Sequence, residues 1–189
     1  MKIQSQTSLS CLELRRLETG DAIRLAVFFE SLSEDSRAFF YPHPLNKGTA
    51  FDLCKLDNDS AMRFILEDPI EQSIAGYFIL DFKVDKHEAE RYRNYDVDLF
   101  RGRNAMLDLV VSERYRRQGF AYNSLQELLV LLEQTDAEQV ILRDGCLSQN
   151  QPAIGLFTKC GFNTLGSYWT VEEHRDMCLK MSEVSINRT

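Results

Sequence analysis

Long apolar runs are absent from this 189-residue sequence: the longest, such as residues 25–29 and 128–132, are far shorter than the about 20 residues that span a bilayer. The first ten residues, MKIQSQTSLS, lack the apolar centre of a secretory signal. Four prolines and nine glycines are too few for a low-complexity linker, and no internal repeat is present. These absences argue against a membrane partner and predict one domain over residues 1–189, long enough to bury a real core.

Cysteine, histidine and positive charge are also scarce. The five cysteines form no C-x-x-C pair and are odd in number, which predicts reduced thiols and a cytoplasmic location. Three scattered histidines argue against a zinc site, so no metal is expected. Lys and Arg total 22 against 29 Asp and Glu, a net charge of −7. This balance argues against nucleic acid as the main partner and mildly favours a cationic one.

Hydrophobic periodicity divides the rest of the chain into strands and helices. Helices are expected at 21–32, 33–40, 118–135 and 151–160, with a weaker candidate at 46–56. Strands are expected at 11–17, 61–67, 73–84, 105–112, 137–144, 163–171 and 175–181. Asp21 and Ser33 are the expected N-caps of the first two helices. Residues 85–104 lack a clean period and predict an elaborated loop with room for one helical turn. This order predicts the mixed α/β (α+β) class, with helices on the faces of one sheet.

The stretch RYRRQGF (residues 114–120) concentrates positive charge between a predicted strand and a predicted helix. A helix N-terminus presents unpaired N–H groups and partial positive charge, and Gly119 would let a ligand approach the backbone closely. Arginines before such a turn would complete a pyrophosphate site. A solvated basic helix start explains the stretch equally well. The sequence has neither G-x-x-x-x-G-K-[ST] nor G-x-G-x-x-G, which excludes a P-loop and a Rossmann fingerprint.

Two ordered patterns decide between these interpretations. Arg116-x-x-Gly119-x-Ala121 resembles the [RQ]-x-x-G-x-[GA] acetyl-CoA signature of the GNAT superfamily of N-acetyltransferases. Residues 150–162, NQPAIGLFTKCGF, resemble the family's second signature, N-x-x-A-x-x-L-[YF]-x-K-x-G-F. The resemblance covers residues of about 10–181 and is specific from about 107 to 162. It makes acetyl-CoA the expected acyl donor.

The resemblance implies a GNAT-like mixed sheet of about seven strands, splayed in the middle and flanked by about four helices. In that family the strand before the pyrophosphate loop carries a β-bulge, and pantetheine lies in the opened slot. Here the slot would lie between residues 107–111 and 140–143, with Asn150 bonding to the cofactor arm or pinning the edge of the slot. The implied cofactor-binding residues are Leu109, Val110, Val111, Arg116, Arg117, Gln118, Gly119, Phe120, Ala121, Tyr122, Asn150 and Phe157.

Family chemistry is direct attack of an amine on the thioester, which needs a base and a proton donor for the leaving thiolate. Asp108 is the candidate base. An equally good interpretation is that Asp108 is a surface carboxylate on a strand whose side chains alternate between core and solvent. Phe157 occupies the position where the family often has a tyrosine acid, and it has no proton to give. Tyr168 or Tyr122 could take that role, and water could also supply the proton.

The acceptor matches no motif, because the segments expected to contact it, residues 33–60 and 85–104, are not recognisable. A small amine such as an amino sugar, polyamine or amino acid is the leading expectation. Protein N-terminal or lysine acetylation, and a non-catalytic acyl-CoA-binding module, are the alternatives. The resemblance also allows a homodimer. His43 is interpreted first as a turn residue without a role and second as part of the acceptor site. Four arginines, Arg91, Arg93, Arg101 and Arg103, are interpreted as solvated.

Overall fold

The structure, a computed structural model, describes residues 12–55, 61–99 and 103–184. Within these ranges the α-helices are α1 (Ala22–Ser31), α2 (Glu34–Ala38), α3 (Lys47–Leu53), α4 (Lys86–Arg93), α5 (Phe120–Leu132), α6 (Gln151–Lys159) and α7 (Met181–Val184). The strands are β1 (Glu13–Arg16), β2 (Ala61–Asp68), β3 (Ser73–Asp81), β4 (Asn104–Val111), β5 (Gln139–Leu142), β6 (Cys146–Leu147), β7 (Asn163–Trp169) and β8 (Glu173–Lys180). Two short 3-10 helices are η1 (Thr19–Asp21) and η2 (Glu113–Tyr115).

The strands form one mixed sheet in the order β1-β2-β3-β4-β5-β8-β6, and β7 pairs with β8. All neighbouring pairs are antiparallel except β4 and β5, which run parallel and are connected through α5. The predicted mixed α/β class is therefore confirmed. The strand that the sequence did not predict is β6, because two residues are too few to show a period.

Helices cover both faces of this sheet, as the alternation of side chains along β4 requires. Leu107 packs into the core beneath α5 and α6. Its neighbour Met106 faces the other way, into the core beneath α4, and Val110 on that face joins the core beneath α1 and α3. The apolar stripe predicted for α5 lies in the first core, where Leu125, Leu128, Leu129 and Leu132 are each at most 2% exposed.

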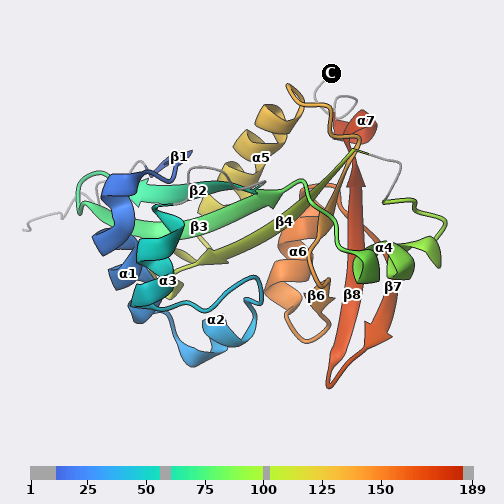
Figure 1. The fold of residues 1–189 in the computed structure, drawn as a ribbon, viewed down its shortest axis with the longest axis horizontal. Helices are drawn as coiled ribbons and strands as arrows, with labels where there is room; N and C mark the ends of the chain where they lie inside the picture. Colours follow the sequence, from blue (N-terminus) through green and yellow to red (C-terminus); the bar gives the residue numbers. More distant parts are fainter. Residues whose placement is uncertain (1–11, 56–60, 100–102, 185–189) are drawn as a thin grey trace, which may run out of the picture.

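The sheet is split between its two parallel strands, as expected. Residues 104–107 of β4 pair with residues 139–142 of β5, and β4 then continues for four residues without β5 beside it. In Figure 1, β4 and β8 converge at the top of the view and diverge towards α2 and β6. The split therefore exposes one edge of β4.

The predicted bulge on β4 is wrong. The β3–β4 pairing runs without a register shift from Gly76↔Val111 to Asp81↔Met106. The split arises instead on the β5 side, where the chain turns away at Asp144 and Gly145, whose φ angles are 51° and 65°. A Cβ on Gly145 would lie 2.7 Å from the carbonyl oxygen of Arg175, so this tight turn requires glycine.

The segment predicted as a loop contains a helix of two turns, α4, capped by the Asp85 side chain. Its inward face includes a charged residue, Glu88, which is 1% exposed and accepts a hydrogen bond from the Asp144 backbone N–H at 2.8 Å. Arg91 is also not solvated, because its side chain is 11% exposed and pairs with the buried Asp176 at 3.0 Å. Arg103 is mostly exposed, as expected. Charged residues on a buried face hid the helical period of this segment.

The two predicted N-caps have different outcomes. Ser33 caps α2, since its Oγ accepts a hydrogen bond from the Ser36 backbone N–H at 3.2 Å. Asp21 does not cap α1 with its side chain, since its buried carboxylate binds Arg15, Arg24 and the Glu18 backbone N–H. Cys11, Arg101 and the end of the weaker helix 46–56 lie outside the described residues.

Candidate active site

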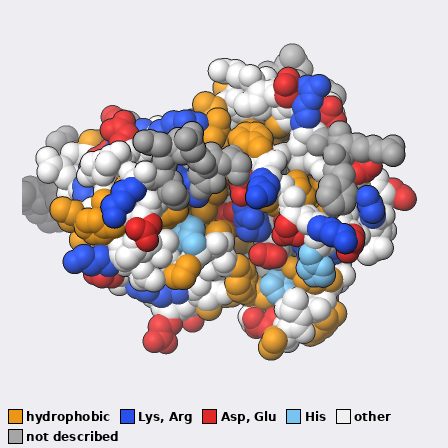
Figure 2. All heavy atoms as spheres, in the orientation of Figure 1, with side chains coloured by type: hydrophobic (Ala, Val, Ile, Leu, Met, Phe, Trp, Pro, Cys, Tyr) orange, Lys and Arg blue, Asp and Glu red, His pale blue; other side chains and the backbone are white. Residues whose placement is uncertain are grey.

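A cavity of about 640 Å³ lies in the opening between β4 and β5. Four segments line it: α2 with the turn that follows, the open end of β4, the turn before α5, and the chain from the end of β5 through α6. Figure 2 shows charged side chains of both signs gathered in the middle of this face, between the two halves of the sheet. The lining thus joins the basic turn noted in the sequence to the unpaired edge of β4.

The turn before α5 has the backbone geometry of an anion-binding site. Arg117 and Gly119 have φ angles of 59° and 85°, and Gly119 is the N-cap of α5 without a side chain to cap the helix. The first N–H groups of α5 have no acceptor within the helix and lie at its positive end. A Cβ on Gly119 would meet no atom within 4 Å, so glycine is required here by conformation and not by crowding.

Asp108 lies in the same cavity, on the part of β4 that lacks β5 as a neighbour. Its side chain is 8% exposed, and Arg143 donates to Oδ2 from Nε at 2.9 Å. Arg143 also donates to Asp81 from Nη2 at 2.8 Å, so one arginine is shared by two carboxylates. Burial raises the pKa of Asp108 to about 7, although Arg143 favours the ionised form. The alternative of a solvated surface carboxylate is therefore wrong for Asp108.

The sequence from residue 28 to residue 162 matches the family model described as "Acetyltransferase (GNAT) family". This chain belongs to that family. No curated protein is significantly similar to the sequence. Membership of this family makes the chain an acyl-transferring enzyme, and it confirms the resemblance to the GNAT superfamily noted in the sequence.

Solved structures share its fold. Ribosomal-protein-S5-alanine acetyltransferase from Vibrio fischeri is 12% identical with a TM-score of 0.72, and the match covers 91% of this chain and 94% of that one. A mutant spermidine N-acetyltransferase from Vibrio cholerae is 18% identical with a TM-score of 0.69, covering 94% and 100%. A GNAT-family acetyltransferase from Streptococcus pneumoniae is 18% identical with a TM-score of 0.65, covering 89% and 99%. At these identities the likeness shows the fold alone.

The residues expected to bind the cofactor lie together in the acetyltransferase. Eleven of the twelve line the cavity, and the exception is Gln118, whose exposed side chain donates to the Arg114 carbonyl oxygen at 2.8 Å. Asn150 lines the cavity and also caps α6, accepting from the Ala153 backbone N–H at 3.3 Å. Phe157 packs on Phe162, with ring centroids 5.4 Å apart. The binding roles of these residues remain predictions.

Two other candidates lie outside the cavity lining. The hydroxyl of Tyr168 donates to the Asp144 carbonyl oxygen at 2.7 Å, and its ring lies 4.2 Å below the guanidinium carbon of Arg91. Tyr168 is not among the lining residues, and its role as an acid remains a prediction. His43 Nε2 lies 3.3 Å from the Tyr77 hydroxyl, and burial lowers the pKa of His43. His43 packs among aromatic rings, in agreement with the reading that gives it no catalytic role.

Part of the cavity lining that sequence reasoning did not name comes from α2 and the turn after it, and a larger part comes from residues 142–159. Asp35, Ser36, Phe39, Phe40 and Tyr41 all line the cavity. Residues 33–60 were expected to contact the acceptor, but His43 was the one residue of that segment named for this role, and none of these five was. Ser36 lies one residue after Asp35, and Phe39 and Phe40 follow Ser36 by three and four residues, which is the spacing of one helix face. A helix of five residues is too short for this spacing to be recognised in the sequence.

Metal and membrane features can be examined only in the described residues. There, no group of three or more His, Cys, Asp and Glu side chains is placed to hold a metal ion. Within the same ranges, no helix combines the length and apolar character that crossing a bilayer would need. The four cysteines described (54, 146, 160 and 178) are buried and unpaired.

Proposed function

We propose that this acetyltransferase moves an acetyl group from acetyl-CoA to a primary amine of a small molecule, by direct attack in a ternary complex. The observation that carries the proposal is the cavity itself. It joins an anion-binding turn, an unpaired strand edge and a buried carboxylate with a pKa of about 7. These three features correspond to the phosphates, the pantetheine arm and the reacting amine.

The turn before α5 fits a diphosphate. Residues 119–122 at the start of α5 line the cavity, as do Arg116, Arg117 and Lys159. Each hydrogen bond to a charged ligand group contributes roughly 1.5–3 kcal/mol, so a handful of these donors would hold the group. The positive charge of this acidic chain is thus concentrated where a polyphosphate needs it.

The open end of β4 fits the pantetheine arm. Residues 108–111 have β3 on one side only, and all four line the cavity. An unpaired strand edge offers backbone donors and acceptors to an extended, amide-containing ligand. Binding there would extend the arm from the phosphate turn towards the centre of the split.

Asp108 is the proposed base for the acceptor amine. Removing a proton from an alkylammonium at pH 7 costs roughly 4–5 kcal/mol, because its pKa is near that of lysine. A carboxylate with a pKa of about 7 is half ionised near neutral pH and can accept this proton directly or through one water. The amine nitrogen then bonds to the thioester carbonyl carbon, and the C–S bond breaks to release a thiolate.

The proton for that thiolate is assigned to water. Phe157 has no acidic proton, and Tyr168, whose hydroxyl donates to the Asp144 carbonyl oxygen, is not among the lining residues. Tyr122 lines the cavity from the first turn of α5, at the end proposed for the phosphates. A CoA thiolate is stable enough to leave without concerted protonation, since thiols have a pKa of about 8.5.

For the acceptor, an acidic residue of α2 and the aromatic residues of the turn after it favour an amine with a second positive charge. Asp35 is exposed on the cavity lining. Phe39 and Tyr41 line the same wall and are 38% and 49% exposed, so their rings are available to a ligand. A carboxylate beside aromatic faces attracts ammonium groups. The spermidine acetyltransferases among the structural relatives are consistent with a polyamine.

An amine panel with a thiol reagent tests this proposal. Putrescine, butylamine and γ-aminobutyrate have the same chain length but different charge. We expect CoA release in the order putrescine, butylamine, γ-aminobutyrate. Asp35→Asn should lower kcat/KM for putrescine by at most about fivefold and leave butylamine unchanged, because the residue is exposed. Binding of acetyl-CoA without CoA release from these amines, or from a peptide with a free N-terminus, would support a non-catalytic module instead.

A further inference from the structure

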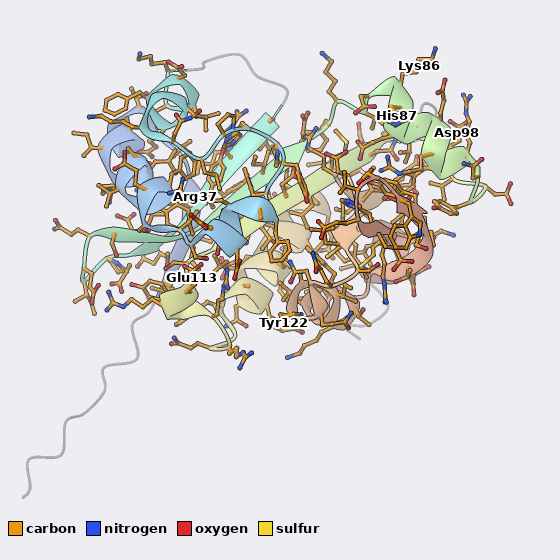
Figure 3. All side chains as sticks on the ribbon, turned by 90° about the horizontal axis from the view of Figure 1, so that it is seen from below. Arg37, Lys86, His87, Asp98, Glu113 and Tyr122 are labelled. Carbon is orange, nitrogen blue, oxygen red and sulfur yellow. The ribbon has the colours of Figure 1, made fainter. Side chains whose placement is uncertain are left out.

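The short helix α2 is attached to the rest of the protein on two sides. On one side Arg37 donates to the carbonyl oxygens of Phe29, Leu32 and Leu45, at 2.6, 3.0 and 2.9 Å. On the other side lies Glu113 of η2, and Figure 3 shows these two residues on either side of α2. Five residues are too few for an independently stable helix. The position of α2 therefore depends on these contacts.

Glu113 connects α2 to the proposed phosphate turn. Its Oε1 accepts hydrogen bonds from the Ser33 hydroxyl at 2.5 Å, from the Ser33 backbone N–H at 3.3 Å, and from the Ser36 hydroxyl. Arg116 Nη2 lies 3.4 Å from the same oxygen and donates to Ser36 Oγ at 2.5 Å. Ser36, Glu113 and Arg116 thus form a closed set of three contacts, which we call the α2 junction.

The α2 junction joins two walls of one cavity. Ser36 lines it together with Asp35, on the wall proposed for the acceptor, and Arg116 lines it from the phosphate turn. Glu113 is not among the lining residues. Burial opposes ionisation of Glu113, but hydrogen bonds from the two serines lower its pKa to about 2, so it is charged at every relevant pH.

We propose that Glu113 is a positioning residue that couples cofactor binding to the acceptor wall. A diphosphate bound at the turn would fix Arg116, and the α2 junction would then hold α2 in the position that receives the amine. The side chains of Glu113 and Arg116 are 38% and 46% exposed, so the junction can open locally without unfolding the core. This inference rests on the proposed function, because it needs a phosphate group at the turn.

Hydrogen exchange with and without CoA tests the coupling and requires no knowledge of the acceptor. Amides of α2 such as that of Arg37, bonded to the Ser33 carbonyl oxygen at 3.1 Å, report on the acceptor wall. In the wild type, CoA should slow exchange in residues 116–122 and also in residues 33–41. In Glu113→Ala, only residues 116–122 should respond. Glu113→Gln keeps an acceptor oxygen and should restore part of the α2 response.

Glu71 supplies a matched control. It pairs with Arg114, so it is a second carboxylate that contacts the same turn, but it comes from the β2–β3 connection and not from α2. Glu71→Gln should leave the α2 response to CoA at its wild-type size. Ser36→Ala removes the contacts of Ser36 with Glu113 and Arg116 but leaves those of Ser33 with Glu113, so it should weaken the α2 response without abolishing it. Thermal melting of each variant confirms that it is folded before exchange is compared.

The outcomes separate this inference from the proposed function. No protection at residues 116–122 would contradict both. Protection there without protection of residues 33–41 in the wild type, or an unchanged α2 response in Glu113→Ala, would overturn the coupling alone. With an accepted amine, Glu113→Ala should raise the acceptor KM about fivefold or more and leave kcat close to wild type. A fall in kcat with unchanged KM would contradict a positioning role.

Discussion

Replacing Asp108 with asparagine removes the proposed base while preserving the shape of the site. The variant loses the acidic oxygen that Arg143 contacts at 2.9 Å, but Arg143 keeps its second carboxylate partner, Asp81, at 2.8 Å. The arginine is therefore not left unpaired, and we expect the fold and the affinity for acetyl-CoA to be preserved. The rate of acetyl transfer should report on the lost base alone.

The expected loss follows from the pKa of Asp108. Because burial raises this pKa to about 7, kcat/KM of the wild type should rise with pH through that value as the carboxylate loses its proton and becomes a base. Proton-transfer catalysis typically contributes 10²–10⁴-fold, roughly 3–5 kcal/mol of barrier. Asp108→Asn should be slower by that factor near pH 7. The deficit should shrink at higher pH, where more of the amine is already neutral.

A pH series of initial rates with acetyl-CoA and putrescine, followed by release of free thiol, measures both effects. Calorimetric titration of each variant with acetyl-CoA is the control for cofactor binding. The reasoning is refuted by an asparagine variant that keeps near wild-type kcat/KM from pH 6 to 9. It is also refuted by a constant deficit across that range, because a missing base should matter less as the amine deprotonates itself.

Three further predictions address binding, the acid and the core. Gly119→Glu places a side chain at φ 85° and a negative charge at the phosphate turn, so calorimetry should show loss of acetyl-CoA binding in a folded protein. An unchanged affinity would contradict the proposal that the phosphates bind at this turn. Phe157→Tyr should leave turnover within a few-fold if water supplies the proton, whereas a large gain in rate would show that the site lacks an acid. Leu128→Ala removes a side chain of α5 that is 1% exposed, and denaturant unfolding should show a loss of about 2–5 kcal/mol in the free energy of unfolding. A loss below about 1 kcal/mol would contradict its place in the core.

The parts of this protein that sequence reasoning predicted are those where local pattern and chemistry agree. The leucines of α5 recur at helical spacing and all face one core. Gly119 and Ala121 could be placed in the site because a strand, a positively charged turn and a helix follow one another in the sequence. Most of the cofactor residues predicted from these motifs do share one cavity.

The parts that failed depend on contacts between distant segments. The raised pKa of Asp108 was not predicted, because it arises from burial in the folded protein, and Arg143, which opposes that rise, is 35 residues away in the chain. Helix α4 was missed because its buried Glu88 serves the Asp144 backbone, a partner that no local pattern reveals. The expected bulge in β4 was carried over from a family resemblance, and the opening forms instead where β5 ends.

Crystals grown with CoA would test the central claim most directly, because electron density shows where the ligand lies. The account predicts the diphosphate against the backbone N–H groups at the start of α5, and the pantetheine arm along residues 108–111 with its sulfur near Asp108. Density for CoA elsewhere, with residues 108–111 and the phosphate turn making no contact to it, would contradict the account.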